Sequence, residues 1–455
     1  NVAVGSAALK SNTTGSLNTA CGRDALQANT TASGNEAFGY GTLGNNTTGS
    51  PNTGMGTSAL SSNTTGGSNV AVGYQALSAN TTALTANTTG NALTAVGANA
   101  LDANTTGLYN TAVGAAALGA TTTGNNNVAV GYQALDANTD GHDTVAIGKG
   151  ALQAFTGSGS VGGSVGVGRD ALNSLTTGES HVAIGENAGY SVTTGNNTVA
   201  VGKLALYANT ANDNTAVGHQ ALQANTSGAD NTAVGRDALN DNTTGTENTA
   251  VGKNALDANT TASYNSALGY NALGANTTGS ENTALGNRSL DANTTGSNNT
   301  AVGQAALTNA TTGSNNTAVG DDALTANTTA NNNTAMGRSA LGGNTTGTQN
   351  TASGTEALLR NTTGNNNTCY GFKAGQFLQT SGSNNGHENT IIGSLAGDSL
   401  TTGHNNTCIG YNSGNAITDG QYNIAIGYTA MLQHTTGNKN IAIGYGAMAD
   451  TGEDS

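Results

Sequence analysis

The chain has 455 residues, of which 35% are apolar and 8% are charged, with no Trp and a single Pro. This composition excludes a thick globular core, but it allows a narrow core of stacked Val, Leu and Ala. The net charge of -14, with 12 Lys and Arg that form no basic cluster, argues against binding to nucleic acid. No apolar run approaches the roughly 20 residues of a membrane-spanning helix, so we expect no membrane insertion.

A pattern of seventeen residues recurs along the chain, and its regular form is NTAVGRDALNDNTTGTE at residues 231–247. We number its positions 1 to 17 from Asn231. The glycine at position 5 occurs 26 times, and 21 of the 25 intervals between these glycines are 17 residues. A period this short predicts one coil per repeat, so we expect an all-β fold, a parallel β-solenoid or β-roll of about 26 seventeen-residue coils. A disordered chain is disfavoured, because the charge is low and the apolar positions keep their register.

Within one coil the sequence predicts a strand at residues 232–234, a bend at Gly235, a short strand at 238–239 and an outer loop at 242–245. Val234 and Leu239 are expected in the core. The bend glycine is expected at positive φ, where a Cβ would be hindered. Strands of successive coils should stack parallel and in register.

In chain order, residues 1–366 form a regular array, and residues 367–455 form a variant section. In the variant section Ile replaces Val in the strands and aromatic residues gather, and we expect these aromatic side chains to fill a wider core. In four coils Gly replaces the usual Leu at position 9, and an aliphatic residue appears three places later. These pairs are Gly189 with Val192, Gly375 with Leu378, Gly397 with Leu400, and Gly414 with Ile417.

Asparagine heads the strand, at position 1, in 21 of the 26 repeats. Asparagines stacked one coil above the next can form hydrogen-bonded ladders, so we predict such a ladder along the coils. The three cysteines are predicted to be small core residues. Cys369 and Cys408 lie two coils apart, about 9 to 10 Å at the usual strand spacing, which is too far for a disulfide.

The loop motif Asn-Thr-Thr matches the acceptor pattern for N-glycosylation. These loops are expected to project outward and to carry glycan at some of the acceptors. The alternative is that Asn, Thr and Gly form a favourable turn, since Asn138 and Asn209 keep the turn but lose the acceptor. The candidate acceptors are Asn12, Asn63, Asn87, Asn104, Asn242, Asn276, Asn293, Asn344 and Asn361.

No catalytic, metal or cofactor site is predicted. The six His residues have no partner at a recurring spacing, whereas metal sites need several converging ligands. Nucleophilic catalysis needs an activated Ser or Cys beside a base, and the spacing offers none. The polar cluster at residues 140–143 is interpreted as a solvated turn rather than a calcium site.

The NTAVG and NIAIG strands, followed by Ala-Leu and a Gly-bearing turn, resemble the head repeats of trimeric autotransporter adhesins and related tail-fibre-like repeat proteins of phages and bacteria. The resemblance covers nearly the whole chain. It implies a parallel β-roll, commonly trimeric, on an extracellular fibre at a cell or virion surface.

The leading hypothesis is therefore an extracellular structural fibre or shaft, glycosylated on its loops and not an enzyme. The alternative is an adhesin that recognises surface carbohydrate or matrix through the variant section. Ice binding through a flat Thr row and a polysaccharide-cleaving solenoid have less support. Apolar residues on both faces of the strand, and the expected lack of polar caps at the two ends, predict that the chain binds itself, as a homotrimer or end to end.

Overall fold

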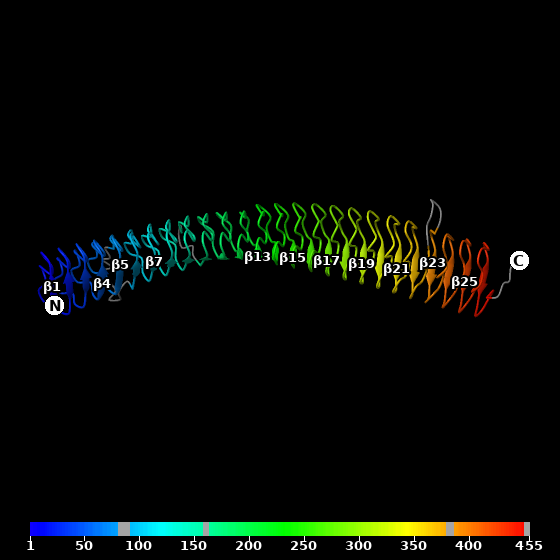
Figure 1. Ribbon diagram of the computed structural model, residues 1–455, viewed down its shortest axis with the longest axis horizontal. Coiled ribbons are helices and arrows are strands. Elements are labelled where there is room, and N and C mark those ends of the chain that lie inside the picture. The colour runs from blue at the N-terminus through cyan, green and yellow to red at the C-terminus, as the bar shows by residue number, and fades with distance from the viewer. Residues whose placement is uncertain (81–91, 158–162, 379–385, 450–455) are drawn as a thin grey trace. The chain divides into compact units, whose positions relative to one another are not determined.

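The computed structural model describes residues 1–80, 92–157, 163–378 and 386–449. All regular elements in these residues are short β-strands, one per coil (Figure 1). The chain divides into two compact units, residues Asn1–Ser227 and Gly228–Ser455. The predicted all-β parallel β-solenoid is confirmed. The proposed division at residue 367 stays a prediction, since β22 pairs with β21 in the same register as the strands before it.

Strands of the first unit pair parallel and one coil apart, so that Val2 lies beside Thr19 and Val4 beside Cys21. These strands are β1 (Val2–Val4), β2 (Thr19–Cys21), β3 (Glu36–Phe38), β4 (Asn52–Met55), β5 (Asn69–Val72), β6 (Thr94–Val96), β7 (Thr111–Val113), β8 (Val128–Val130), β9 (Val145–Ile147), β10 (Val165–Val167), β11 (Val182–Ile184), β12 (Val199–Val201) and β13 (Thr215–Val217).

Strands of the second unit keep the same parallel register, with Thr232 beside Thr249 and Val234 beside Val251. They are β14 (Thr232–Val234), β15 (Thr249–Val251), β16 (Ser266–Leu268), β17 (Thr283–Leu285), β18 (Thr300–Val302), β19 (Thr317–Val319), β20 (Thr334–Met336), β21 (Thr351–Ser353), β22 (Thr368–Tyr370), β23 (Thr390–Ile392), β24 (Thr407–Ile409), β25 (Ile424–Ile426) and β26 (Ile441–Ile443).

The core of each coil is made by Ala and Leu rather than by Val. Ala233, Ala238 and Leu239 are all 0% exposed, whereas Val234 is 37% exposed. The prediction that Val234 lies in the core is therefore wrong, and the prediction for Leu239 is confirmed. Strand residues alternate in direction, so placing Ala233 inside turns Thr232 and Val234 outward.

Leu239 belongs to a turn and not to the predicted second strand. Its φ is 52°, in the left-handed region. This backbone conformation breaks the alternation of a strand and lets Ala238 and Leu239 both point inward. A left-handed residue costs about 1–2 kcal/mol, while burying a Leu side chain gains about 1.5–3 kcal/mol. Burial outweighs the backbone cost.

The position-5 glycine makes the bend that the sequence predicts. Gly235 has a φ of 141°. A Cβ built on Gly235 would collide with the backbone carbonyl of Gly252 in the next coil. Glycine is required here because coils approach each other backbone to backbone.

Asparagine at position 1 forms the predicted ladder, which runs without a break from Asn231 to Asn440 in the second unit. At each step the backbone N–H of one Asn donates to Oδ1 of the Asn in the preceding coil, at 2.9–3.0 Å. The side-chain Nδ2 also donates to a loop carbonyl of its own coil, as Asn282 does to Gly296 at 2.9 Å. The side chain thus satisfies buried backbone groups that the short strand leaves unpaired.

Positions 9 and 12 both contribute side chains to the interior of the coil, and a larger residue at position 12 compensates for a Gly at position 9. Val192, Leu378, Leu400 and Ile417 follow a Gly at position 9, and each is 0% exposed. The sequence interpretation of these pairs as a packing compensation is confirmed. Position 12 therefore faces the interior.

We expect Asn282→Ala to destabilise its coil locally. The change leaves the buried N–H of Asn299 without its partner and removes one of the two donors to the carbonyl of Gly296, which keeps its bond from Asn293 Nδ2. Leaving the Asn299 N–H buried and unpaired costs about 1–3 kcal/mol. Hydrogen exchange at the Asn299 amide should accelerate by at least tenfold. Exposed Asn287 in the same coil is the control, and equal acceleration by Asn287→Ala would contradict a role for the ladder.

Candidate functional site

The candidate glycosylation asparagines lie inside the coils. Seven of them are 0% exposed: Asn63, Asn104, Asn242, Asn276, Asn293, Asn344 and Asn361. Asn12 is half-buried, and Asn87 lies outside the described residues. The expectation that these acceptors project outward is therefore wrong for the seven buried residues.

These position-12 asparagines form a second ladder that the sequence interpretation missed. Asn276 Nδ2 donates to Oδ1 of Asn259 in the preceding coil at 2.9 Å and to the carbonyl of Gly279 at 2.9 Å. Asn63 makes the equivalent bonds at 2.8 and 3.0 Å. Nδ2 is the atom that would carry an N-linked sugar, and here it is buried and used twice as a donor. The geometry favours the alternative of a structural turn.

The threonine after each of these asparagines stabilises the outside of the turn. Thr277 Oγ1 donates to the carbonyl of Thr294 in the next coil at 2.9 Å, and Thr294 repeats the bond to Thr311 at 3.0 Å. The Asn-Thr pair thus carries one inner and one outer hydrogen-bond row. The loop motif needs no modification to explain its repetition.

We expect the folded protein to carry no N-linked glycan at the seven buried asparagines. A sugar on Nδ2 would have to replace two hydrogen bonds and would have no space in the coil interior. Peptide mapping of protein secreted from a eukaryotic host should return these peptides at their unmodified mass. A folded product with glycan on Asn276 or Asn293 would contradict this placement.

The outward side chains of the strands, at positions 2 and 4, form what we call the outer strand face. In the second unit this face contains no charged residue from β14 to β26, and in the first unit its single charge is Glu36. Its aliphatic groups are solvent-exposed, with Leu268 at 49%, Leu285 at 42% and Ile392 at 39%. Position 2 is Thr or Ser from β14 to β24, so the exposed aliphatic side chains form a row at position 4. Exposed apolar side chains that lie together mark interaction sites, whereas single scattered ones do not.

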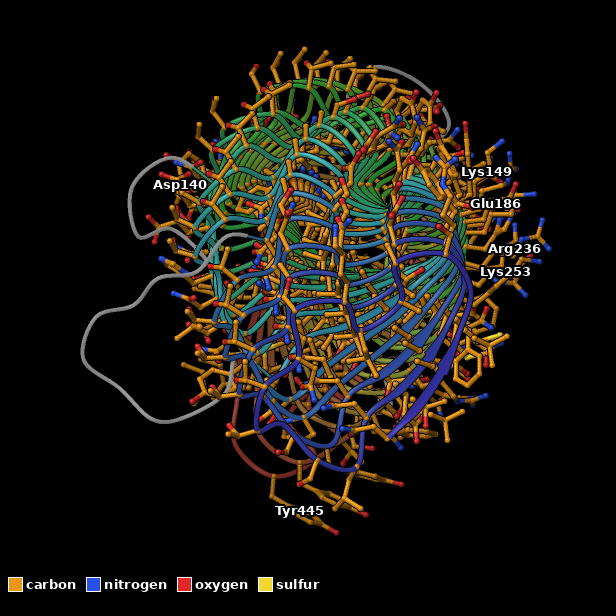
Figure 2. The ribbon with its side chains drawn as sticks, turned by 90° about the vertical axis from the view of Figure 1, so that its left-hand side faces the viewer. Asp140, Lys149, Glu186, Arg236, Lys253 and Tyr445 are labelled. Atoms are coloured by element: carbon orange, nitrogen blue, oxygen red, sulfur yellow. The ribbon has the colours of Figure 1, made fainter. Side chains whose placement is uncertain are left out.

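Charged side chains border this face at position 6. Seven of the 12 Lys and Arg residues occupy this position: Arg23, Lys149, Arg169, Lys203, Arg236, Lys253 and Arg338. In the first unit Lys149 and Glu186 project from one side of the coils, and Asp140 projects from the opposite side (Figure 2).

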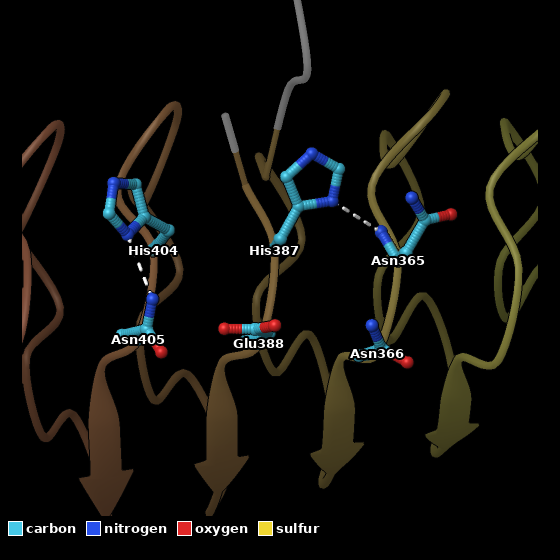
Figure 3. Close-up of a pocket in the computed structure, with 6 residues that line it drawn as sticks. All are labelled: Asn365, Asn366, His387, Glu388, His404 and Asn405. Atoms are coloured by element: carbon cyan, nitrogen blue, oxygen red, sulfur yellow. Dashed lines mark hydrogen bonds between the residues drawn. The ribbon is translucent and has the colours of Figure 1, made fainter. Parts of the chain in front are cut away.

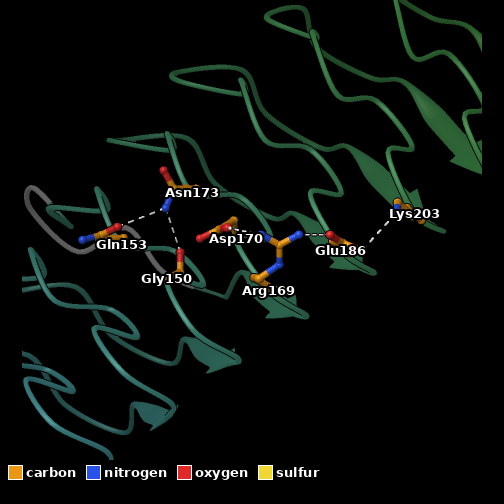
Figure 4. Close-up of polar contacts among 7 residues, drawn as sticks. All are labelled: Gly150, Gln153, Arg169, Asp170, Asn173, Glu186 and Lys203. Carbon is orange, nitrogen blue, oxygen red and sulfur yellow. Dashed lines mark hydrogen bonds and ion pairs between the residues drawn. The ribbon is translucent and has the colours of Figure 1, made fainter.

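Ion pairs link position 6 from coil to coil in the first unit. Glu186 pairs with Arg169 of the preceding coil and with Lys203 of the next, the latter at 3.2 Å (Figure 4). Arg169 also reaches Asp170 at 3.7 Å. Beside them, Asn173 Nδ2 donates to the carbonyl of Gly150 at 3.0 Å and to Gln153 Oε1 at 3.2 Å. Exposed pairs of this kind contribute little to stability.

Most of the aromatic residues of the variant section lie on the surface and do not widen the core. Tyr370, Phe372, Tyr411 and Tyr428 are 44–49% exposed. Tyr411 stacks on Tyr428 with ring centroids 5.3 Å apart, and Tyr428 stacks on Tyr445 at 5.2 Å. The expectation of a wider aromatic core is wrong, because positions 4 and 6 face outward.

Two of the three cysteines are core residues, as predicted. Cys369 and Cys408 are 0% exposed, with Ile391 between them in the pairing of β22, β23 and β24. Burial raises the pKa of Cys408 to about 12 and raises the pKa of Cys369 in the same direction. Cys21 differs, because it lies at position 4 and is exposed, so the core prediction is wrong for this residue.

A carboxylate cluster forms in the second unit at Asp237, Asp241 and Asp257. Burial, followed by the charges of Asp241 and Asp237, raises the pKa of Asp257 to about 6. Across the described residues, no group of three or more His, Cys, Asp or Glu side chains is arranged to hold a metal ion. The described part of the chain also contains no helix long and apolar enough to cross a membrane.

His181 replaces Asn at position 1 in the first unit and is 0% exposed. Its Nδ1 lies 2.6 Å from Thr198 Oγ1 and 3.4 Å from the backbone nitrogen of Thr198, which donates to it. Burial lowers the pKa of His181, partly offset by a hydrogen bond with the backbone of Gly195. The imidazole is therefore held neutral where the asparagine ladder is interrupted.

We expect the coils around His181 to lose stability as the pH falls. Because the folded-state pKa is below the ordinary value of 6.5, the unfolded chain takes up the proton first, and stability drops from about pH 6.5 downward to the folded pKa. His181→Asn should remove this contribution, because an amide side chain does not titrate in this range. Urea unfolding at pH 7.5 and 5.5 should show a smaller pH difference for the variant, and an unchanged difference would contradict this account.

No protein-family model and no curated protein matches this sequence. The functional argument therefore depends on the residues and on their geometry.

Proposed function

We propose that this chain is a structural segment of an extracellular fibre, and that copies of it associate side by side through the outer strand face. The observation that carries the proposal is the uncharged, solvent-exposed outer strand face of the second unit. A single coil buries Ala233, Ala238 and Leu239, which leaves the aliphatic row at position 4 without a partner. Contact with another copy would remove this apolar surface from water.

Charges at the two edges of the face support a parallel arrangement of copies. In the second unit Asp230 and Arg236 flank β14, and Glu247 and Lys253 flank β15. In the first unit Asp143 and Lys149 flank β9 in the same order. Copies related by rotation about an axis parallel to the solenoid keep equivalent coils level. The basic edge of one copy then meets the acidic edge of the next, which favours a closed ring over an open sheet.

The number of copies, three, comes from the resemblance to trimeric adhesin heads, and so does the location outside the cell or virion. The end-to-end association expected from the sequence remains part of the proposal. Catalysis does not. Rigidity is the property that this role requires, and the two Asn ladders and the Thr row, repeated from coil to coil, are suited to it.

We expect the native protein to sediment at three times the chain mass of 44.4 kDa. Leu268→Asp combined with Leu285→Asp should dissociate it, because two carboxylates would be buried at an apolar contact. Both side chains point outward in the described structure, so the coil itself should stay folded. Analytical ultracentrifugation gives the mass, and circular dichroism reports the fold.

Thr278→Asp combined with Thr295→Asp is the matched control. Thr278 lies in the loop of the coil that contains β16, and Thr295 in the loop of the coil that contains β17, away from the outer strand face. The change adds the same charge. The control should leave the sedimenting mass unchanged. A wild-type protein that sediments as a single chain at micromolar concentration would overturn the proposal.

A further inference from the structure

A recess in the second unit is formed by the residues that immediately precede β22, β23 and β24. Its volume is about 450 Å³. Six side chains from three successive coils line it: Asn365, Asn366, His387, Glu388, His404 and Asn405 (Figure 3). The lining includes one carboxylate and neither Lys nor Arg, and all six residues are polar. Recesses with converging polar groups are the usual form of small-ligand sites.

Hydrogen bonds fix the orientation of both imidazoles. His387 Nδ1 accepts the backbone N–H of Asn365 at 2.8 Å. His404 Nδ1 lies 3.0 Å from Asn405 Nδ2, an amide nitrogen that can only donate. In a neutral imidazole with Nδ1 as the acceptor, the proton is on Nε2. Both rings therefore present an Nε2–H donor, and in the described structure neither Nε2 has a partner.

Acceptors complement these donors. Glu388 lies between the side chains of Asn366 and Asn405, below the two rings (Figure 3). Among the described residues its carboxylate makes no ion pair or hydrogen bond, and the Glu388 side chain is exposed. The Asn366 amide is likewise exposed and adds one acceptor and two donors. The recess thus combines donors and acceptors at the spacing of neighbouring coils.

This combination of hydrogen-bond donors and acceptors indicates which class of ligand the recess can bind. An anion would meet Glu388 and no opposing Lys or Arg. An apolar molecule would leave the imidazole and carboxylate groups desolvated and unpaired. A hydroxyl group both donates and accepts, so a molecule with several hydroxyls can satisfy Nε2–H donors and the carboxylate together.

An aromatic ring lies at the side of this polar group. Tyr422, in the next coil, contacts the His404 ring edge to face with centroids 5.4 Å apart, and it is 50% exposed. A tyrosine ring offers an apolar face with a polar tip, which suits the C–H face of a sugar ring.

We propose that this recess binds a neutral saccharide unit through His387, His404 and Glu388, with Tyr422 packing beside it. The inference goes beyond the fibre role, since the recess is lined by positions 16 and 17 of three coils, beside the outer strand face, and not by positions 2 and 4. A fibre with this site would carry a saccharide contact in each copy. Repetition of a weak site on associated copies raises the overall strength of attachment.

The test is saturation-transfer difference NMR on the whole chain with four probes, the methyl glycosides of glucose, galactose, mannose and N-acetylglucosamine. At least one probe should bind saturably. His404→Ala and Glu388→Gln should each weaken binding by about tenfold, the effect of losing one hydrogen bond to a polar or charged group.

His142→Ala is the matched control. His142 Nδ1 also accepts a backbone N–H, that of Asn125 at 2.9 Å, but His142 lies in the first unit and outside this recess. Its loss should leave the affinity unchanged. Repeating the titration on the Leu268→Asp and Leu285→Asp variant separates the two proposals, since saccharide binding should persist when self-association is lost.

Absence of saturation transfer from all four glycosides would overturn the proposal, and so would equal weakening by His142→Ala and His404→Ala. Calorimetry with Zn²⁺ alone is the third arm. Zn²⁺ binding that is lost in His404→Ala, with no glycoside binding, would identify a metal site instead and would also overturn it.

Discussion

The structure depends on one constraint, which is that a seventeen-residue coil must satisfy its own backbone in a very narrow interior. Most coils contain a three-residue strand, and the remaining backbone turns around a core of Ala and Leu. Water cannot reach the inner N–H and C=O groups of these turns, and leaving them unpaired would cost about 1–3 kcal/mol each. Two rows of asparagines, at positions 1 and 12, form hydrogen bonds with these backbone groups. The amide side chain carries both a donor and an acceptor, so it can bond within its coil and to the coil beside it.

Backbone conformation follows from the same narrowness. Gly235 and its equivalents lie against the backbone carbonyl of the corresponding glycine in the next coil, so no side chain fits there. Leu239 adopts positive φ so that two consecutive apolar side chains can enter the interior. Because a small residue, usually Ala, takes the inward position of the strand, the Val and Ile side chains at positions 2 and 4 are left outside. The apolar outer strand face is a consequence of how the coil closes.

The sequence was sufficient to predict the coil length, the parallel register, the bend glycine and the position-1 ladder, because all of these follow from periodicity. It was not sufficient to assign which side chains of a coil face the interior and which face the solvent. Strand alternation cannot be extended across Leu239, whose left-handed backbone has no signature in the letters Ala-Leu. The Asn-Thr-Thr turn was misplaced because Asn, Thr and Gly are typical of exposed loops. One signal could have corrected it: Val192, Leu378, Leu400 and Ile417 occupy the same position as the turn asparagines, and they compensate a lost core Leu. The only sign of the recess in the sequence was the concentration of unusual residues after Asn367. The side chains that line it lie at positions 16 and 17 of different coils, and their proximity depends on the fold.

The most direct test of the account is the exchange of asparagine side-chain amide protons with solvent, measured residue by residue in the folded protein. If both rows are interior ladders, the Nδ2 protons of Asn282 and Asn276 will exchange far more slowly than those of exposed Asn287 and Asn366. If the interior asparagines exchange as fast as the exposed ones, the ladders do not hold the coils together and the account is wrong.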